Sequence, residues 1–142
     1  MREGVLLGED EVEFVEIMAE RMRARDMDVT TSTSATAALS LIAAESYDAV
    51  IMDFMMPEMD GIQALKAIKE KRPEMQIILL TGHATVEKGV EAMKAGAMDF
   101  VEKPADLDAL SEKIKKAHHK KAVIVQKQSQ DKVIEMLRKF GM

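Results

Sequence analysis

Acidic side chains follow two of the apolar segments in this sequence, at the point where each segment ends. Asp53 comes directly after the apolar run Val50–Met52, and Glu9 and Asp10 follow residues 4–8. Short apolar runs bounded by turn residues are typical of buried strands in a parallel sheet. Because the carboxyl ends of such strands open on one crevice of the sheet, we expect these carboxylates to lie close together.

Two further runs end in residues that suit phosphate chemistry. Thr81 follows the apolar segment 76–80, and Lys103 follows 99–102. Like charges about 4 Å apart repel by roughly 4 kcal/mol at an effective dielectric of 20, so the three carboxylates require a cation. Mg²⁺ fits because it uses one or two carboxylates, keeps water ligands and accepts a phosphoryl oxygen. Each residue alone could cap a loop, but together they predict a magnesium and phosphate site.

The apolar pattern predicts five strands that alternate with five helices. The strands are expected at 4–8, 27–31, 50–53, 76–80 and 99–102, and the helices begin near Val12, Ser34, Ile62, Val86 and Asp106. Ser34 and Asp106 are candidate caps. Each crossover is long enough for a βαβ unit, so we expect an α/β fold: a doubly wound, five-stranded parallel sheet with helices on both faces. Pro57 and Gly61 predict a loop that overhangs Asp53.

Composition indicates one domain with an appendage. The 142 residues are 47% hydrophobic, carry a net charge of −5 and include no cysteine. These values speak against a nucleic-acid surface, a disulfide framework and a thiolate metal site, and no apolar stretch could span a bilayer. We therefore expect a cytoplasmic protein without membrane or direct nucleic-acid contact, with a domain at 4–119 and a partly helical C-terminal extension at 120–142.

Residues 4–119 resemble the receiver domain of bacterial response regulators, which has a flavodoxin-like fold. The resemblance rests on motifs around four of the five strand ends: Glu9-Asp10, Asp53 with Met56-Pro57 and Asp60-Gly61, Thr81-Gly82, and Phe100 with Lys103-Pro104. The segment from Gly82 to Phe100 is similar to that of enhancer-binding-type activators, in which a receiver precedes an output domain. An output domain or a target protein is therefore an expected partner.

The resemblance implies that Asp53 accepts a phosphoryl group from a sensor histidine kinase. It implies that Mg²⁺ is bound by Asp10, Asp53 and the Met55 carbonyl, with Glu9 acting mainly through water. Thr81 and Lys103 would bind phosphoryl oxygens. The domain would not be an enzyme with its own substrate, but it would have self-phosphorylation and autodephosphorylation chemistry.

The resemblance also implies a conformational switch, in which Thr81 moves toward the phosphoryl group and Phe100 turns inward. Without the family, Thr81 would be interpreted as a strand-end hydroxyl bonded to the backbone and Phe100 as a half-buried sheet residue. The family pattern has Asp more often than Glu at position 9 and a branched apolar residue at position 8. It also suggests a cis Lys103-Pro104 bond. His83 is interpreted as a solvated loop residue.

Other functions remain as alternatives. A phosphohydrolase with an aspartyl nucleophile would want a second acid two residues later, where this sequence has Met55. A flavin-binding protein would want an uncharged phosphate loop after the first strand, where this sequence has acids. The remaining alternative is a receiver-like module that acts through protein contacts without phosphorylation.

Two helical segments predict dynamic or associative behaviour. Gly89 lies within the fourth helix and should make it the least rigid of the five.

In the extension, an apolar stripe predicts a helix that packs on its own receiver, on a second copy as a homodimer, or on an output domain. The stripe consists of Val133, Ile134, Leu137 and Phe140.

Overall fold

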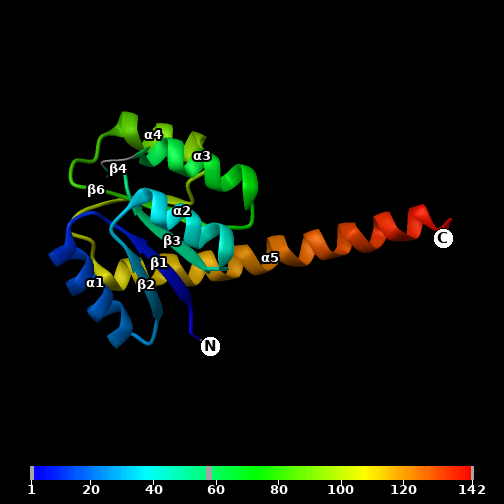
Figure 1. The fold of residues 1–142 in the computed structure, drawn as a ribbon, viewed down its shortest axis with the longest axis horizontal. Helices are drawn as coiled ribbons and strands as arrows, with labels where there is room; N and C mark the ends of the chain where they lie inside the picture. Colours follow the sequence, from blue (N-terminus) through cyan, green and yellow to red (C-terminus); the bar gives the residue numbers. More distant parts are fainter. Residues whose placement is uncertain (1, 57–58, 142) are drawn as a thin grey trace.

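The computed structural model describes residues 2–56 and 59–141. Its centre is a five-stranded parallel sheet in the order β2-β1-β3-β6-β7 (Figure 1). The strands are β1 (Gly4–Gly8), β2 (Asp28–Ser32), β3 (Ala49–Asp53), β6 (Ile77–Thr81) and β7 (Asp99–Glu102). The predicted doubly wound sheet is confirmed, and each strand lies within one residue of its predicted position.

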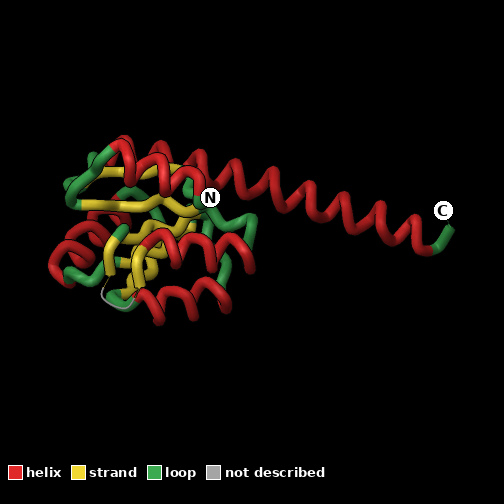
Figure 2. Tube along the Cα trace, turned by 90° about the horizontal axis from the view of Figure 1, so that it is seen from above, coloured by secondary structure: helices red, strands yellow, loops and turns green. Residues whose placement is uncertain are grey.

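Helices cover both faces of this sheet, as predicted (Figure 2). They are α1 (Val12–Ala24), α2 (Ala35–Ala44), α3 (Gly61–Lys71), α4 (Val86–Lys94) and α5 (Leu107–Lys139). One hydrophobic cluster joins α1 and α5 to the sheet, and a second joins α2, α3 and α4 to the opposite face. This double coverage explains why the three central strands, β1, β3 and β6, are nearly continuous apolar runs.

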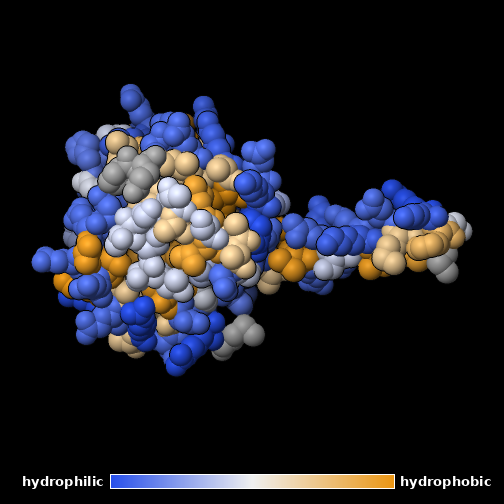
Figure 3. Space-filling model, viewed as in Figure 1, coloured by the Kyte–Doolittle hydropathy of each residue, from blue (hydrophilic) through white to orange (hydrophobic). Residues whose placement is uncertain are grey.

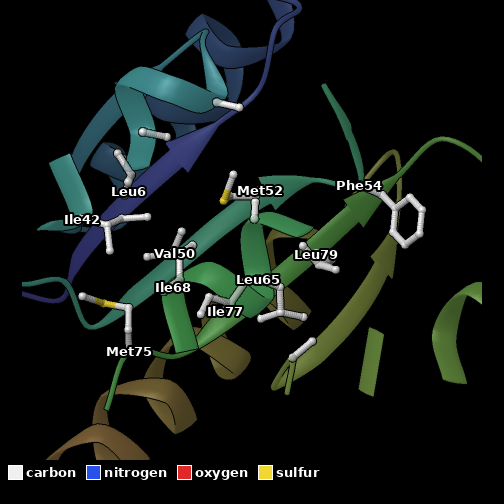
Figure 4. Close-up of a cluster of buried hydrophobic side chains, with 14 of the residues drawn as sticks. Leu6, Ile42, Val50, Met52, Phe54, Leu65, Ile68, Met75, Ile77 and Leu79 are labelled. Atoms are coloured by element: carbon white, nitrogen blue, oxygen red, sulfur yellow. The ribbon is translucent and has the colours of Figure 1, made fainter. Parts of the chain in front are cut away.

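The two clusters alternate along each central strand. Val50, Met52, Ile77 and Leu79 point toward the α2–α3 side together with Leu65 of α3 (Figure 4). The residues between them, Ile51, Ile78 and Leu80, belong to the α1–α5 side. Because β3 and β6 are buried on both faces, the carboxyl ends of these strands are held firmly in the core.

Helix caps agree with the sequence. The Ser34 hydroxyl accepts a hydrogen bond from the Ala37 amide at 3.3 Å, and the Asp106 carboxylate accepts one from Asp108 at 3.0 Å. Each bond satisfies an amide that the first turn of a helix leaves without a partner. Both predicted caps are therefore confirmed.

The chain after Asp53 contains a short hairpin that the sequence analysis did not predict. Strand β4 (Met55–Met56) pairs antiparallel with β5 (Met59–Asp60). Pro57, on which the predicted loop depended, lies outside the described residues. Gly61 begins α3, and a Cβ atom there would lie 2.7 Å from the Phe54 carbonyl oxygen, so the close approach of two backbone segments requires glycine.

Helix α5 continues without interruption from the sheet into the extension. Its 33 residues reach Lys139, whereas the extension at 120–142 was expected to be only partly helical. The domain boundary near residue 120 therefore remains a prediction, because no break in the helix marks it. No helix of the described part of the chain, residues 2–56 and 59–141, is long and apolar enough to cross a membrane.

Candidate functional site

Two of the carboxylates expected at the strand ends, those of Glu9 and Asp53, meet one ammonium group at the carboxyl edge of the sheet. Lys103 Nζ lies 2.6 Å from Asp53 Oδ2 and also forms an ion pair with Glu9 Oε2. Glu11 Oε1 is 3.8 Å away from the same nitrogen. Strands β1, β3 and β7 thus bring together residues that are up to 94 positions apart in the sequence.

Asp53 is buried and held from two sides. Only 7% of the residue is exposed. Its Oδ1 accepts a hydrogen bond from the Met55 amide at 2.8 Å, while Oδ2 faces Lys103. The hairpin that follows β3 therefore fixes the carboxylate, with both oxygens oriented by nearby donors.

The three charged groups perturb one another. Burial and a hydrogen bond with Asp53 raise the pKa of Glu9 to about 8, although Lys103 opposes the change. Burial also raises the pKa of Asp53, but hydrogen bonds with Glu9 and Lys103 outweigh it, and the pKa is lowered overall. Burial lowers the pKa of Lys103, but its bonds to both carboxylates raise it more. Burial thus favours the protonated form of Glu9, whereas the contacts with Lys103 favour an ionised Asp53 and a charged Lys103.

The acidic residues fit a hard divalent cation. Ligand oxygens of Glu9, Asp10 and Asp53 all lie within 4.8 Å of one another. Within the described part of the chain, the partner of the buried Glu9 Oε2 is the Lys103 ammonium. A buried carboxylate that already attracts an ammonium also favours a second cation nearby. An all-oxygen donor set suits Mg²⁺ better than a soft transition metal.

Thr81 ends β6 and is 4% exposed. Its hydroxyl accepts a hydrogen bond from the His83 amide at 3.2 Å, and its carbonyl accepts one from the Lys103 amide at 2.7 Å. The second bond ties the two predicted phosphate-binding residues through the backbone. His83 is exposed in the loop, as predicted.

Phe100 on β7 is half-buried against the α2–α4 side of the core. Its ring meets that of Phe54, and a Cβ atom on Gly89 of α4 would lie 3.4 Å from Phe100 Cδ1. Gly89 thus leaves room for an aromatic ring between α4 and the sheet. Sequence reasoning singled out Phe100 but did not predict this contact.

The sequence did not predict two contacts near the site between a lysine ammonium and an aromatic ring. The Phe14 ring of α1 lies under the Lys103 ammonium at 4.8 Å, and the Lys88 ammonium of α4 lies 5.6 Å from the Phe54 ring. Such cation–π contacts help to orient a cation. For the Lys88–Phe54 contact, the position of Phe54 directly after Asp53 was the one hint in the sequence that this ring lies near the site. The Lys103-Pro104 bond is cis, as the family resemblance suggested.

Comparison with known proteins gives a consistent result. The family model for the response regulator receiver domain matches residues 5–115. The transcriptional regulatory protein ZraR of Salmonella typhimurium is 38% identical over 113 residues, which cover 80% of this chain and 26% of that protein. The regulatory protein AtoC of Escherichia coli is 37% identical over 107 residues, which cover 75% of this chain and 23% of that protein. The chain therefore spans about a quarter of the length of these curated relatives.

Solved structures share the fold. A response regulator receiver domain protein from Clostridium thermocellum superposes with a TM-score of 0.81 at 31% identity, covering 86% of this chain and 98% of that chain. NtrX from Brucella abortus superposes with a TM-score of 0.81 at 27% identity, covering 90% of this chain and 29% of that chain. This chain belongs to the family of response regulator receiver domains.

Proposed function

We propose that Asp53 is the phosphoacceptor of this receiver domain and that the donor is a phosphohistidine of a sensor histidine kinase. The observation that carries the proposal is the contact of 2.6 Å between the buried Asp53 carboxylate and the Lys103 ammonium, beside two further acids. A buried, ionised carboxylate with a cation at hand has the properties of a nucleophile for phosphoryl transfer.

In the transfer, a carboxylate oxygen of Asp53 forms a bond to phosphorus as the bond from phosphorus to the histidine nitrogen breaks. The electron pair of that bond returns to the imidazole. Lys103 stabilises negative charge on the phosphoryl oxygens, and the Thr81 hydroxyl donates to one of them after it leaves the His83 amide. The Met55 amide holds the acceptor carboxylate in position.

Mg²⁺ is the proposed cofactor of this site. Asp10, Asp53 and the Met55 carbonyl would hold it directly, and Glu9 would act mainly through water. When bound, the ion supplies positive charge that offsets the charge on the transferred group. Glu9 would lose its proton on cation binding, because a nearby positive charge favours the carboxylate.

The product would be a labile acyl phosphate, so the same site would also promote its own dephosphorylation. The domain is a regulator, and self-phosphorylation and autodephosphorylation are its proposed intrinsic chemistry. The phosphorylated state would draw Thr81 toward the new oxygens and allow Phe100 to move further inward. This switch would control an output domain or a target protein, because the curated relatives extend well beyond the matched segment.

We further propose that the domain works in the cytoplasm, where a kinase that delivers phosphohistidine has access to it. We do not propose direct nucleic-acid binding by this chain, because its net charge of −5 would repel the phosphates of a nucleic acid. DNA contact would then fall to an output domain.

Incubation with acetyl phosphate and Mg²⁺, followed by intact-mass measurement, tests the acceptor. The wild-type chain should gain one phosphoryl group, and Asp53→Asn should gain none because it keeps the side-chain volume but removes the nucleophile. Asp108→Asn, an exposed Asp-to-Asn change away from the site, serves as the matched control and should behave as wild type. A phosphorylated Asp53→Asn chain would refute the assignment. A wild-type chain that gains no phosphoryl group would favour the alternative of a non-phosphorylated interaction module.

A further inference from the structure

The aromatic ring of Phe14 lies beside the Lys103 ammonium at the edge of the candidate site. The ammonium nitrogen is 4.8 Å from the centre of this ring. Phe14 is the third residue of α1, whereas Lys103 directly follows β7, so the contact joins two elements that flank the site. A cation within about 6 Å of a ring centroid is attracted by the negative face of the ring. Phe14 is therefore placed to hold the ammonium from the side of α1.

The ring is oriented by its own packing. Phe14 is half-buried and packs against the cluster that joins α1 and α5 to the sheet. Ile17 and Met18, one turn further along α1, line the same cavity as Phe14, and Pro104 and Leu107 line it from the segment after β7. A side chain packed in this way has already lost rotamer freedom on folding. It can thus orient the ammonium at little further entropic cost.

The other partners of the ammonium include two acids that a metal ion would also use. Lys103 Nζ pairs with Asp53 Oδ2 at 2.6 Å and with Glu9 Oε2. A hard divalent cation prefers oxygen ligands and would draw on the same two carboxylates together with that of Asp10. Cation binding therefore competes with Lys103 for Glu9 and Asp53, but it does not compete for the Phe14 ring.

We propose that Phe14 is a positioning residue for phosphoryl transfer, and that its ring holds the Lys103 ammonium beside Asp53 when a divalent cation occupies the acidic residues. The inference rests on the proposed phosphoacceptor function of Asp53. A carboxylate in place of the ring would also attract the ammonium, but it would neutralise the positive charge. The ring has no net charge, so the ammonium that it holds keeps its full charge for the phosphoryl oxygens.

Phosphorylation by acetyl phosphate at saturating Mg²⁺ tests the role of the ring. Phe14→Leu keeps an apolar side chain but removes the aromatic face, so the rate should fall by about three- to tenfold. Mg²⁺ affinity, measured by calorimetry, should be unchanged because the ring is not a proposed ligand. Phe14→Trp, which restores an aromatic face, should recover most of the rate.

The matched control for packing is Ile17→Ala, which removes apolar contacts from the same cavity and leaves the ring in place. It should phosphorylate at the wild-type rate. An equal loss of rate in Ile17→Ala and Phe14→Leu would overturn the proposal, because packing of α1 would then explain both. Weakened Mg²⁺ binding in Phe14→Leu would overturn it as well.

Fluorinated phenylalanines introduced at position 14 separate electrostatics from shape. Fluorine withdraws electron density from the ring face and changes the size of the ring little, so each added fluorine should slow phosphorylation further. The matched control is the same series at Phe140, which is 69% exposed at the end of the helix that projects from the domain in Figure 3. That series should leave the rate unchanged. A rate that does not depend on fluorination at position 14 would overturn the proposal.

Proton NMR of the Lys103 side chain provides a readout that does not depend on phosphorylation. Protons above an aromatic face are shifted upfield, so the signals of the methylene next to Nζ should move downfield in Phe14→Leu, both with and without Mg²⁺. A shift that is seen only without Mg²⁺ would overturn the proposal, because the ring would then release the ammonium when the cation binds. A wild-type chain that gains no phosphoryl group would refute the acceptor function itself. A chain that is phosphorylated equally well with and without the ring would refute only the role of Phe14.

Discussion

The ring of Phe54 packs edge-on against the ring of Phe100, with centroids 5.9 Å apart and planes at 73°. Phe54 follows Asp53 directly, and Phe100 is the proposed switch residue on β7. The residue that follows the proposed phosphoacceptor therefore contacts the proposed switch residue through its aromatic ring. Edge-to-face pairs of this kind are favourable because the positive ring edge meets the negative ring face.

A double-mutant cycle should detect this contact as coupling energy. Phe54→Leu and Phe100→Leu each remove one ring, and urea unfolding of the four proteins gives the coupling between them. We expect about 0.5–1.5 kcal/mol, the range of aromatic pairs. Phe54→Leu paired with Phe14→Leu, a ring on the opposite face of the sheet, is the control cycle and should be additive. Additivity in the Phe54–Phe100 cycle would mean that the rings do not interact measurably.

Gly89 should make α4 less rigid than its neighbours. Glycine within a helix costs about 1 kcal/mol relative to alanine, so amide hydrogens of α4 should exchange faster than those of α3. Gly89→Ala should slow exchange in α4 while leaving α3 unchanged, provided Phe100 Cδ1 accommodates a Cβ atom at 3.4 Å. Equal protection of the two helices in the wild type would contradict the expectation.

The raised pKa of Glu9 predicts a loss of stability with increasing pH when no divalent cation is present. The unfolded chain releases the Glu9 proton near pH 4.5, whereas the folded chain holds it to about pH 8. Between these values the folded state binds more protons, so the free energy of unfolding should fall as pH rises, by an amount on the order of a few kcal/mol. The lowered pKa of Asp53 acts with the opposite sign, and only below its ordinary value of 3.8.

Urea unfolding between pH 5 and pH 9, with EDTA or with Mg²⁺, measures this dependence. Glu9→Gln should flatten the curve in EDTA, because it removes the titrating group and keeps its shape. Glu45→Gln, an exposed glutamate change, is the matched control and should retain the wild-type slope. A Glu9→Gln curve as steep as that of the wild type would place the titration on another group.

Replacing Lys103 should slow phosphoryl transfer without weakening cation binding. Lys103→Gln removes the ammonium that contacts Asp53 and Glu9, so phosphorylation by acetyl phosphate should slow by about 10²-fold or more. Mg²⁺ affinity, measured by calorimetry, should be retained or should increase, because a competing positive charge is gone. Lys113→Gln, at the ion pair with Asp99, controls for loss of a lysine elsewhere. Loss of Mg²⁺ binding in Lys103→Gln alone would show that the ammonium supports the cation site rather than the transfer.

The sequence predicted the sheet and the strand-end carboxylates well because strands buried on both faces are continuous apolar runs. The hairpin of β4 and β5 could not be predicted from the sequence, because strands of two residues show no periodicity. The continuity of α5 was missed for another reason. The extension was expected to be only partly helical, yet the glutamine and lysine residues of the polar run 126–130 favour helix and continue it.

Side-chain contacts across the sheet also could not be predicted from the sequence. The Phe54–Phe100 pair and the Phe14 ring beneath Lys103 join segments whose separation depends on strand register. The order β2-β1-β3-β6-β7 determines these neighbours, and no local pattern encodes it. The family resemblance supplied roles for single residues but not the aromatic contacts between them.

Because α5 is one helix, its packed and projecting halves form a lever arm. Leu110, Ile114 and Ala117 anchor it on the sheet, and the tip lies about 30 Å beyond residue 120. A tilt of the anchored half by about 5° would displace the tip by about 3 Å, roughly the rise of two helical residues. Small adjustments of packing beside β7 would thus be magnified at the far end of the helix.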